Sequence, residues 1–346
     1  MNTPADAHQP PAINFWKGWL DVARGVLDRP AAVIDDMLYK ASHLAETNYA
    51  IAQDMSDKGL FKDAVFRLRI VLWVAPQHQP ACYLLGCCYI ALQQMEKAQA
   101  ILRKAVTLQP EDAEAQFMLA TLDPYHMPEA QQPTSMPDSI ALNYFDSHAP
   151  SYETAQLEAG YRAHQCADEA LWDALDRRRN DYHVLELGCG SGLCGMLMAE
   201  HAATIVGVDY CLPMLDIARP KRRPDFRRVY TEIIHQDIRQ FIHHLREPEY
   251  DAIVAAHVFN YVGDIAMIIT QAIHGLKSGG VFVFQVEPYP YEGRFGLLPK
   301  LGRFGHSDGY IRHYLEYAGF ELLEHAMVSV YPDYEMAQYV ARKATH

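Results

Sequence analysis

The sequence has no stretch of about 18 uninterrupted apolar residues, so no membrane-spanning helix is expected. The N-terminus lacks a basic segment followed by an apolar one, so no secretion signal is expected either. Cationic residues are also few, because 30 Lys and Arg stand against 43 Asp and Glu, a formal net charge of −13. Since nucleic-acid affinity depends mainly on neutralising phosphates, this deficit argues against DNA or RNA as a partner.

The spacing of the cysteines suggests no cross-link. The seven cysteines, at positions 82, 87, 88, 166, 189, 194 and 211, are odd in number and form no paired C-x-x-C spacing with histidine partners. Neither a disulfide framework nor a zinc site is indicated, and no metal is expected. A reduced, cytoplasmic location fits best. One basic run interrupts the acidic balance and is interpreted as a solvated surface, although it could contact an anionic partner: Arg219, Lys221, Arg222, Arg223, Arg227 and Arg228.

The N-terminal part contains an internal repeat. At an offset of 34 residues, Gly59–Ala64 matches Gln93–Ala98, and Pro76 matches Pro110. In the second copy, small or apolar residues fall where a helical hairpin needs them, at Leu85, Gly86, Tyr89, Ala98, Ala105 and Pro110. These positions resemble a tetratricopeptide repeat, which implies paired helices that dock a protein partner or mediate self-association.

Further helices are expected at both ends of the repeats. Two repeats alone would expose their apolar ends, so the helical pattern from Phe15 to about His43 is expected to pack on the first repeat. Ala113–Leu122 is expected to be a capping helix. Four prolines between Asp123 and Pro137 then predict a linker.

After the linker, short β-rich apolar runs alternate with helical patterns. The runs are His183–Leu187, Thr204–Val208, Thr231–His235, Asp251–Ala256 and Val281–Val286. Such alternation predicts a mostly parallel sheet with helices on both faces. Two last runs, Phe320–Val330 and Glu335–Val340, are divided by Tyr331-Pro-Asp333 and predict a terminal antiparallel hairpin. We therefore expect an N-terminal extension at 1–42, repeats at 43–123, a linker at 124–142 and a seven-stranded α/β domain of Rossmann-like architecture at 143–346.

The first expected strand runs into a glycine-rich turn, Glu186-Leu-Gly-Cys-Gly-Ser-Gly192. Such a turn lets a ligand approach the backbone. A dinucleotide fingerprint counted from Gly188 needs glycine at position 193, which is Leu193, so an NAD-dependent oxidoreductase is the lowest-ranked alternative. The run resembles the first motif of class I S-adenosylmethionine-dependent methyltransferases. An acidic residue at position 186 suits their cationic aminoacyl and sulfonium ligand.

The resemblance continues in order along the chain. Val206-Gly-Val-Asp209 places a carboxylate at the tip of the second strand, where it can accept both ribose hydroxyl protons, and Leu276–Gly280 resembles the turn before the fifth strand. Tyr210 and the segment around it resemble the stretch that lays an apolar side chain on the adenine. The resemblance implies this set of cofactor-binding residues: Glu186, Gly188, Cys189, Gly190, Gly192, Asp209, Tyr210, Met214, Asp237, Ile238, His257, Tyr152 and Arg162.

A closer resemblance is to bacterial methyltransferases that carry tetratricopeptide repeats, through Tyr144–Tyr152, Leu157–Arg162 and Arg303–Ser307. It implies that the segment before the first strand folds over the cofactor. Arg162 would then pair with the cofactor carboxylate, unless it is a surface residue. His257 stands where relatives often have Asp, and it either contacts the cofactor or the acceptor or packs in the interior.

Methyl transfer from a sulfonium is an in-line displacement, so positioning and exclusion of water matter most and a base is optional. His306 and His257 are the candidate bases. Tyr261, Tyr289 and Tyr291 suggest a partly apolar or planar acceptor. The expected function is methyl transfer from S-adenosylmethionine to a small-molecule or protein acceptor, with S-adenosylhomocysteine as product. The alternative is a non-catalytic adaptor with a structural Rossmann-like domain.

Overall fold

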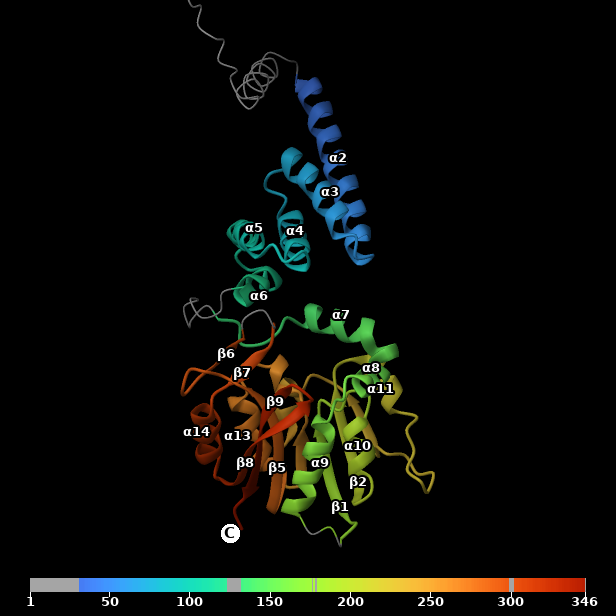
Figure 1. Cartoon of the computed structure of the whole chain (residues 1–346), viewed down its shortest axis with the longest axis vertical. Coiled ribbons are helices and arrows are strands. Elements are labelled where there is room, and N and C mark those ends of the chain that lie inside the picture. The colour runs from blue at the N-terminus through green and yellow to red at the C-terminus, as the bar shows by residue number, and fades with distance from the viewer. Residues whose placement is uncertain (1–30, 123–131, 176, 178, 299–301, 346) are drawn as a thin grey trace, which may run out of the picture. The chain divides into compact units, whose positions relative to one another are not determined.

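The chain divides into two compact units, Met1–Glu111 and Asp112–His346 (Figure 1). The computed structural model describes residues 31–122, 132–175, 177, 179–298 and 302–345. Most of the helix expected between Phe15 and His43, and the first part of the linker, lie outside the described residues. Within the described ranges, no helix is long and apolar enough to cross a membrane.

The first unit is entirely helical where it is described, with α2 packed on α3 and α4 packed on α5. The four helices are α2 (Ala31–Asp57), α3 (Phe61–Val74), α4 (Gln79–Ala91) and α5 (Met95–Leu108). Both hairpins turn through a left-handed residue at the same repeat position, Gly59 with φ 73° and Gln93 with φ 57°. The backbone therefore repeats at the 34-residue offset predicted from the sequence.

Close helix packing explains the small residue in α4. A Cβ added to Gly86 would lie 2.5 Å from Cγ of Leu102, which is fully buried on α5. Only glycine lets these two helices approach this closely. Ala64, Leu68 and Val71 of α3 are fully buried in a core that α4 shares.

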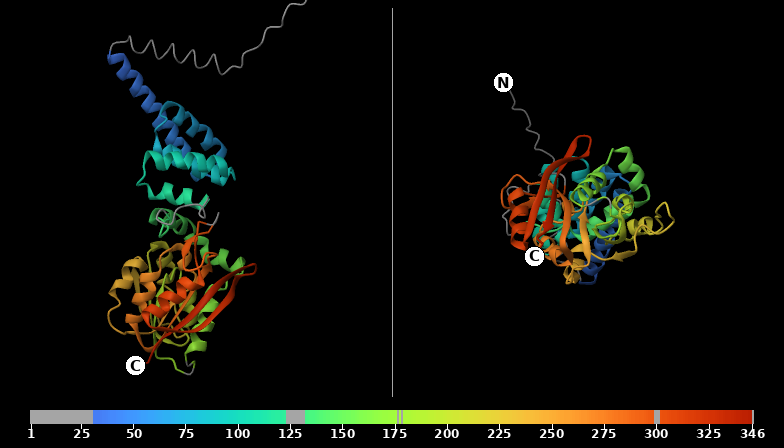
Figure 2. Two further views of the ribbon diagram at one scale, coloured as in Figure 1. Left: turned by 90° about the vertical axis from the view of Figure 1, so that its left-hand side faces the viewer. Right: turned by 90° about the horizontal axis from the view of Figure 1, so that it is seen from below.

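The second unit contains the predicted sheet. Its strands run in the order β3-β2-β1-β4-β5, all parallel, and β9 then pairs antiparallel with β5 and with β8. The two long strands β8 and β9 run side by side in the left view of Figure 2. The mostly parallel seven-stranded arrangement with a C-terminal antiparallel hairpin is thus confirmed. The strands are β1 (Tyr182–Leu187), β2 (Ala202–Asp209), β3 (Glu232–His235), β4 (Tyr250–Ala255), β5 (Leu276–Pro288), β8 (Phe320–Tyr331) and β9 (Tyr334–Lys343).

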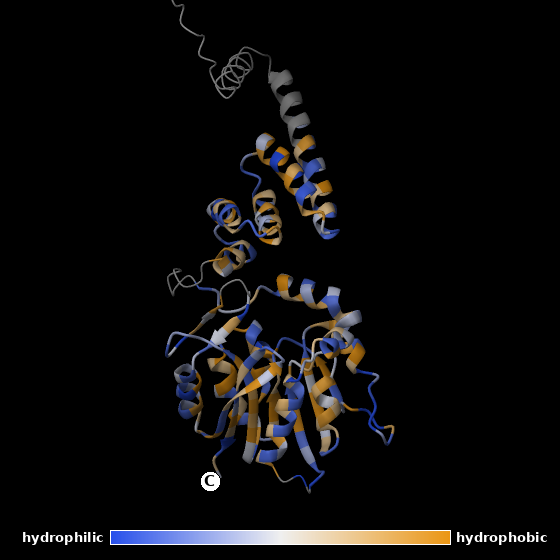
Figure 3. Cartoon of the chain, in the orientation of Figure 1, coloured by the Kyte–Doolittle hydropathy of each residue, from blue (hydrophilic) through white to orange (hydrophobic). Residues whose placement is uncertain are grey.

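Two hydrophobic clusters cover the two faces of this sheet, because successive side chains of a strand point to opposite faces. Val184 packs with α9 (Ala163–Ala174), α10 (Leu193–Met198) and α11 (Leu212–Ala218). Leu185 packs with α12 (Ile238–Phe241), α13 (Ala266–Gly275) and α14 (Asp308–Ala318). Figure 3 shows hydrophobic residues along the central strands, as burial on both faces requires.

A short hairpin that the sequence did not predict extends the sheet beyond the end of β5. Its strands are β6 (Phe295–Leu297) and β7 (Phe304–His306), and Gly305 pairs with Glu287 of β5. Phe304 packs with Phe117 of α6 (Ala113–Leu122), at 6.2 Å between ring centroids. The hairpin brings the segment around Arg303 to the C-terminal edge of the parallel strands.

The segment before β1 forms α7 (Asp138–His148), the short helix η3 (Ala149–Ser151) and α8 (Tyr152–Glu158). Polar contacts fasten it to the sheet domain, among them Asp138 to Arg239 at 2.7 Å, Glu153 to Lys221 at 2.5 Å, and Gln156 to Tyr331 at 2.6 Å. Ala149 packs with Cys211 and Met214 at the end of β2. This segment forms one wall of the cavity described next.

Candidate active site

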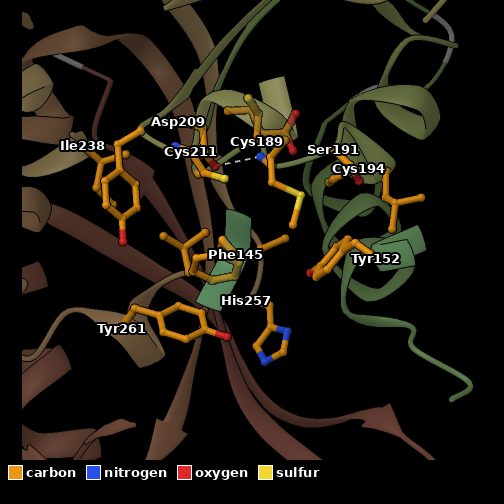
Figure 4. Close-up of a pocket in the computed structure, with 18 of the residues that line it drawn as sticks. Phe145, Tyr152, Cys189, Ser191, Cys194, Asp209, Cys211, Ile238, His257 and Tyr261 are labelled. Atoms are coloured by element: carbon orange, nitrogen blue, oxygen red, sulfur yellow. Dashed lines mark hydrogen bonds between the residues drawn. The ribbon is translucent and has the colours of Figure 1, made fainter. Parts of the chain in front are cut away.

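A cavity of about 1220 Å³, counting its open mouth, lies at the C-terminal ends of β1 to β4. In open parallel sheets, this edge is where ligands bind. Figure 4 shows side chains from the strand ends and from α7 and α8 facing this space.

The glycine-rich loop after β1 has three left-handed glycines, and they serve different purposes. A Cβ on Gly188 would lie 2.4 Å from Val258, and one on Gly192 would lie 3.0 Å from Tyr230. At Gly190, with φ 51°, no atom of the described residues lies within 4 Å of the added Cβ. Gly188 and Gly192 therefore permit packing, whereas Gly190 keeps the backbone open to the cavity.

Asp209 connects this loop to the end of β2. Its carboxylate accepts the Gly190 N–H at 2.8 Å and the Cys211 N–H at 2.9 Å. Burial raises the pKa of Asp209, and the backbone N–H bonds act in the opposite direction. Because both carboxylate oxygens are fixed by backbone, the group points into the cavity in one orientation (Figure 4).

Glu186 lines the same end of the cavity and is enclosed by the protein. Its side chain is 2% exposed and accepts a hydrogen bond from the Tyr230 hydroxyl at 2.7 Å. Burial raises the pKa of Glu186 to about 8. The sequence suggested that Glu186 attracts a cationic ligand. With this raised pKa, the carboxyl group attracts a cation only after it has lost its proton.

The ends of β2 and β3 supply an apolar slot with a polar rim. Met214 and Ile238 are buried and line the cavity, as do Tyr210 and Cys189. Asp237 caps α12 by accepting the Arg239 N–H at 2.7 Å, and its carboxylate also pairs with the Arg239 side chain.

His257 lies at the other end of the cavity, directly after β4. Its φ of 58° is unusual for a residue with a side chain and indicates local strain. Among the residues that the structure describes, none bonds to its buried Nε2. Desolvation lowers the pKa of His257 to about 3, and the nearby charge of Arg303 contributes. The ring is therefore an uncharged imidazole.

Tyrosines line the cavity around His257. The His257 ring lies 5.4 Å from the Tyr161 ring and 6.1 Å from the Tyr331 ring. In Figure 4, the Tyr261 hydroxyl lies on the His257 side of the cavity, and Tyr152 faces it from across the space. Burial raises the pKa of Tyr261 to about 12 and that of Tyr152 further, so both are neutral phenols.

Eleven expected site residues line this cavity, and three do not. The eleven are Glu186, Gly188, Cys189, Gly190, Asp209, Tyr210, Met214, Asp237, Ile238, His257 and Tyr152. Gly192 lies behind the loop, at the start of α10. Arg162 is exposed and donates from Nε to Gln165 at 3.1 Å. His306 is 1% exposed, and its Nε2 donates to the Gly263 carbonyl at 2.7 Å, beneath the β6–β7 hairpin.

Of the three tyrosines that the sequence suggested for the acceptor pocket, the structure places one in the cavity lining. Tyr261 lines the cavity, whereas Tyr289 and Tyr291 are not among the lining residues. Sequence reasoning missed Tyr161, Tyr331 and Arg303 as lining residues. Tyr161 and Arg303 lie in segments that had been recognised by resemblance, but Tyr331 had been interpreted only as part of a turn.

Comparisons with known proteins agree with this geometry. Residues 185–284 match the model of a methyltransferase domain, and residues 79–112 match that of a tetratricopeptide repeat. The ubiquinone biosynthesis O-methyltransferase of Coxiella burnetii strain Dugway 5J108-111 is 27% identical over 169 residues, which cover 43% of this chain and 68% of that protein. The malonyl-[acyl-carrier protein] O-methyltransferase of Bacillus anthracis is 27% identical over 120 residues, which cover 33% and 42%.

Two solved methyltransferase structures align with part of this chain at low identity. The Synechocystis PCC 6803 magnesium protoporphyrin IX methyltransferase with bound S-adenosylhomocysteine is 18% identical and has a TM-score of 0.47. The alignment covers 60% of this chain and 99% of that protein. The Burkholderia thailandensis 1,6-didemethyltoxoflavin-N1-methyltransferase is 16% identical and has a TM-score of 0.46. The alignment covers 63% of this chain and 98% of that protein. The enzymes of the same name from four other Coxiella burnetii strains are 28% identical, and this chain spans 53% of their length.

The second unit therefore contains a methyltransferase domain. The first unit contains a tetratricopeptide repeat.

Proposed function

We propose that the second unit transfers the methyl group of S-adenosylmethionine to a small-molecule acceptor and releases S-adenosylhomocysteine. The observation that carries this proposal is the arrangement within one cavity: the open backbone at Gly190 and the fixed Asp209 carboxylate lie at one end, and an aromatic compartment around His257 lies at the other. One curated relative is named an O-methyltransferase of ubiquinone biosynthesis, which supports the same class of reaction.

In this proposal, the end of the cavity at Gly190 and Asp209 binds the nucleoside part of the cofactor. Asp209 accepts the ribose hydroxyl protons, and Met214, Ile238 and Tyr210 contact the adenine, with Asp237 near its amino group. Glu186, Cys189 and the loop from Gly188 to Gly192 surround the aminoacyl end. No role is proposed for Arg162 or His306, because both lie outside the cavity lining.

The sulfonium supplies an activated methyl group, so the acceptor end has only to orient a nucleophile and exclude water. Tyr152 and Tyr261 line the compartment with neutral hydroxyls, which can orient an acceptor by hydrogen bonding. For a hydroxyl acceptor, the unpartnered Nε2 of His257 is placed to take the proton as the new bond to carbon forms. Its low pKa keeps this nitrogen unprotonated at neutral pH.

For the first unit, we propose that the helical hairpins bind a protein partner or a second copy of the chain. We also propose a reduced, cytoplasmic location, in keeping with seven cysteines that are all free. Pull-down of a defined partner, together with light scattering of the purified chain, separates these two roles of the repeats.

Calorimetric titration with S-adenosylhomocysteine tests the cofactor assignment. We expect saturable binding that Asp209→Ala abolishes, because the variant loses the only carboxylate at the tip of β2. A methyl-transfer assay with tritiated cofactor then uses protein and small-molecule fractions of the producing cells. Cofactor binding without labelling of any fraction would favour the adaptor, and nicotinamide binding that excludes the methyl donor would favour an oxidoreductase.

A further inference from the structure

The acceptor end of the cavity contains a positive charge that the proposed reaction does not use. Arg303 precedes β7 and lines the cavity together with His257, Tyr261 and Tyr331. Its charge reaches these neighbours, because it lowers the pKa of His257 and opposes the rise in that of Tyr261.

The two arginines that line the cavity differ in how far they are neutralised. Arg239, at the adenine end, pairs with both Asp237 and Asp138. Among the described acidic residues, Arg303 forms an ion pair with Glu287, through a contact of 3.2 Å between Nη1 and Oε1. A guanidinium has five N–H donors in a rigid fork, so one such contact leaves donors of Arg303 available to a ligand.

Arg303 is held from behind, which fixes the direction in which it presents those donors. Glu287, on β5, is 2% exposed and is not among the cavity-lining residues. The Tyr334 ring lies 5.9 Å from the guanidinium carbon. Glu287 and Tyr334, neither of which lines the cavity, thus hold Arg303 at the cavity wall.

The surroundings define the shape and charge of a suitable ligand. The carboxylic acids that line the cavity, Asp138, Glu186, Asp209 and Asp237, come from α7 and from the ends of β1, β2 and β3, at the cofactor end. Flat rings line the acceptor end, where Phe145 and Tyr261 are 5.0 Å apart. This compartment therefore combines a cation, neutral phenols and aromatic walls.

We propose that the methyl acceptor is a small planar carboxylic acid whose carboxylate binds Arg303. This inference rests on the proposed function and specifies its substrate class. A carboxylate matches the fork of a guanidinium and can bind it through two parallel hydrogen bonds. The cofactor also carries a carboxylate, so the experiment must distinguish the two sources.

The first arm needs no turnover. Benzoate and benzamide, which differ mainly in charge, are titrated into the complex of the protein with S-adenosylhomocysteine and followed by ligand-observed NMR. We expect benzoate to bind at least about tenfold more tightly than benzamide, and Arg303→Gln to remove the difference. Equal binding, no benzoate binding at millimolar concentration, or a preference that survives in Arg303→Gln would overturn the proposal.

The second arm uses the transfer assay. The small-molecule fraction is passed over an anion exchanger at neutral pH, and we expect the acceptor in the retained material. Arg303→Gln should raise the KM for this acceptor by about tenfold or more, and Arg303→Lys should restore part of the loss. Arg219→Gln removes one charge from an exposed ion pair and serves as the matched control. An acceptor in the flow-through would refute the assignment.

A third measurement shows whether Arg303 binds the carboxylate of the acceptor or that of the cofactor. If Arg303 instead binds the cofactor, Arg303→Gln weakens binding of S-adenosylhomocysteine but not of methylthioadenosine, which lacks the aminoacyl group. That result would overturn the acceptor assignment. Wild-type protein that binds S-adenosylhomocysteine and benzoate but labels no fraction would instead contradict the proposed methyl transfer.

Discussion

Replacing Gly190 by valine should abolish cofactor binding and leave the fold intact. The Cβ position at Gly190 has free space around it among the described residues, so the substitution creates no clash in the unliganded protein. The backbone φ of 51° adds strain, which costs roughly 1–3 kcal/mol. A branched side chain here projects into the cavity at the place where the loop should meet the ligand.

These terms translate into a thermal-shift experiment. A loss of roughly 1–3 kcal/mol lowers the Tm of a domain of this size by about 2–12 °C. S-adenosylhomocysteine at about a hundred times its Kd stabilises the wild-type protein by about 2.7 kcal/mol, which raises Tm by about 5–11 °C. Gly190→Val should therefore have the lower Tm, and S-adenosylhomocysteine should not raise it.

Gly293→Val is the matched control. Gly293 has φ 70°, no described atom within 4 Å of its Cβ position, and no place in the cavity lining. It should therefore lose similar stability and keep the full ligand-induced shift. A normal shift in Gly190→Val, or its loss in Gly293→Val, would refute the assignment of the open loop to the cofactor.

Three further predictions concern stability. Gln93→Gly should stabilise the helical unit by about 1 kcal/mol in urea unfolding, because it removes a side chain from a left-handed position; no gain would mean that the turn is unstrained. Gly86→Ala should cost about 1–3 kcal/mol, and less in a Leu102→Ala background, whereas additive losses would contradict the 2.5 Å approach. The raised pKa of Glu186, about 8, means that the folded chain keeps a proton that the unfolded chain loses above pH 4.5, so the free energy of unfolding falls as pH rises to 8. Glu186→Gln should flatten this part of the pH dependence between pH 5 and 9, and an unchanged slope would place its origin elsewhere.

The sheet and the cofactor loop were readable from the sequence because their signals are local. Buried parallel strands need apolar runs of limited length, and the run predicted at His183–Leu187 differs from β1 by one residue. Gly190 and Asp209 were recognised from their places after the first and second strands. These positions depend on a few consecutive residues, whatever the rest of the chain does.

The β6–β7 hairpin left no comparable signal. Its strands have three residues each, which is too short for a period of two to be recognised. His306 appeared as a candidate base because it lies in a segment recognised by resemblance. The structure places it in the core, where its Nε2 bonds to a backbone carbonyl.

The sequence by itself determined the order of elements, the repeat and many of the residues that line the cavity at the ends of β1 to β3, because periodicity and turn chemistry act over short distances along the chain. Only the tertiary structure brought Arg303, Tyr331 and His257 together, from the hairpin, the end of β8 and the end of β4. Which side chains share a cavity, and which of them keep their charge there, depends on distances through space and on desolvation. Neither quantity is encoded in the spacing of residues.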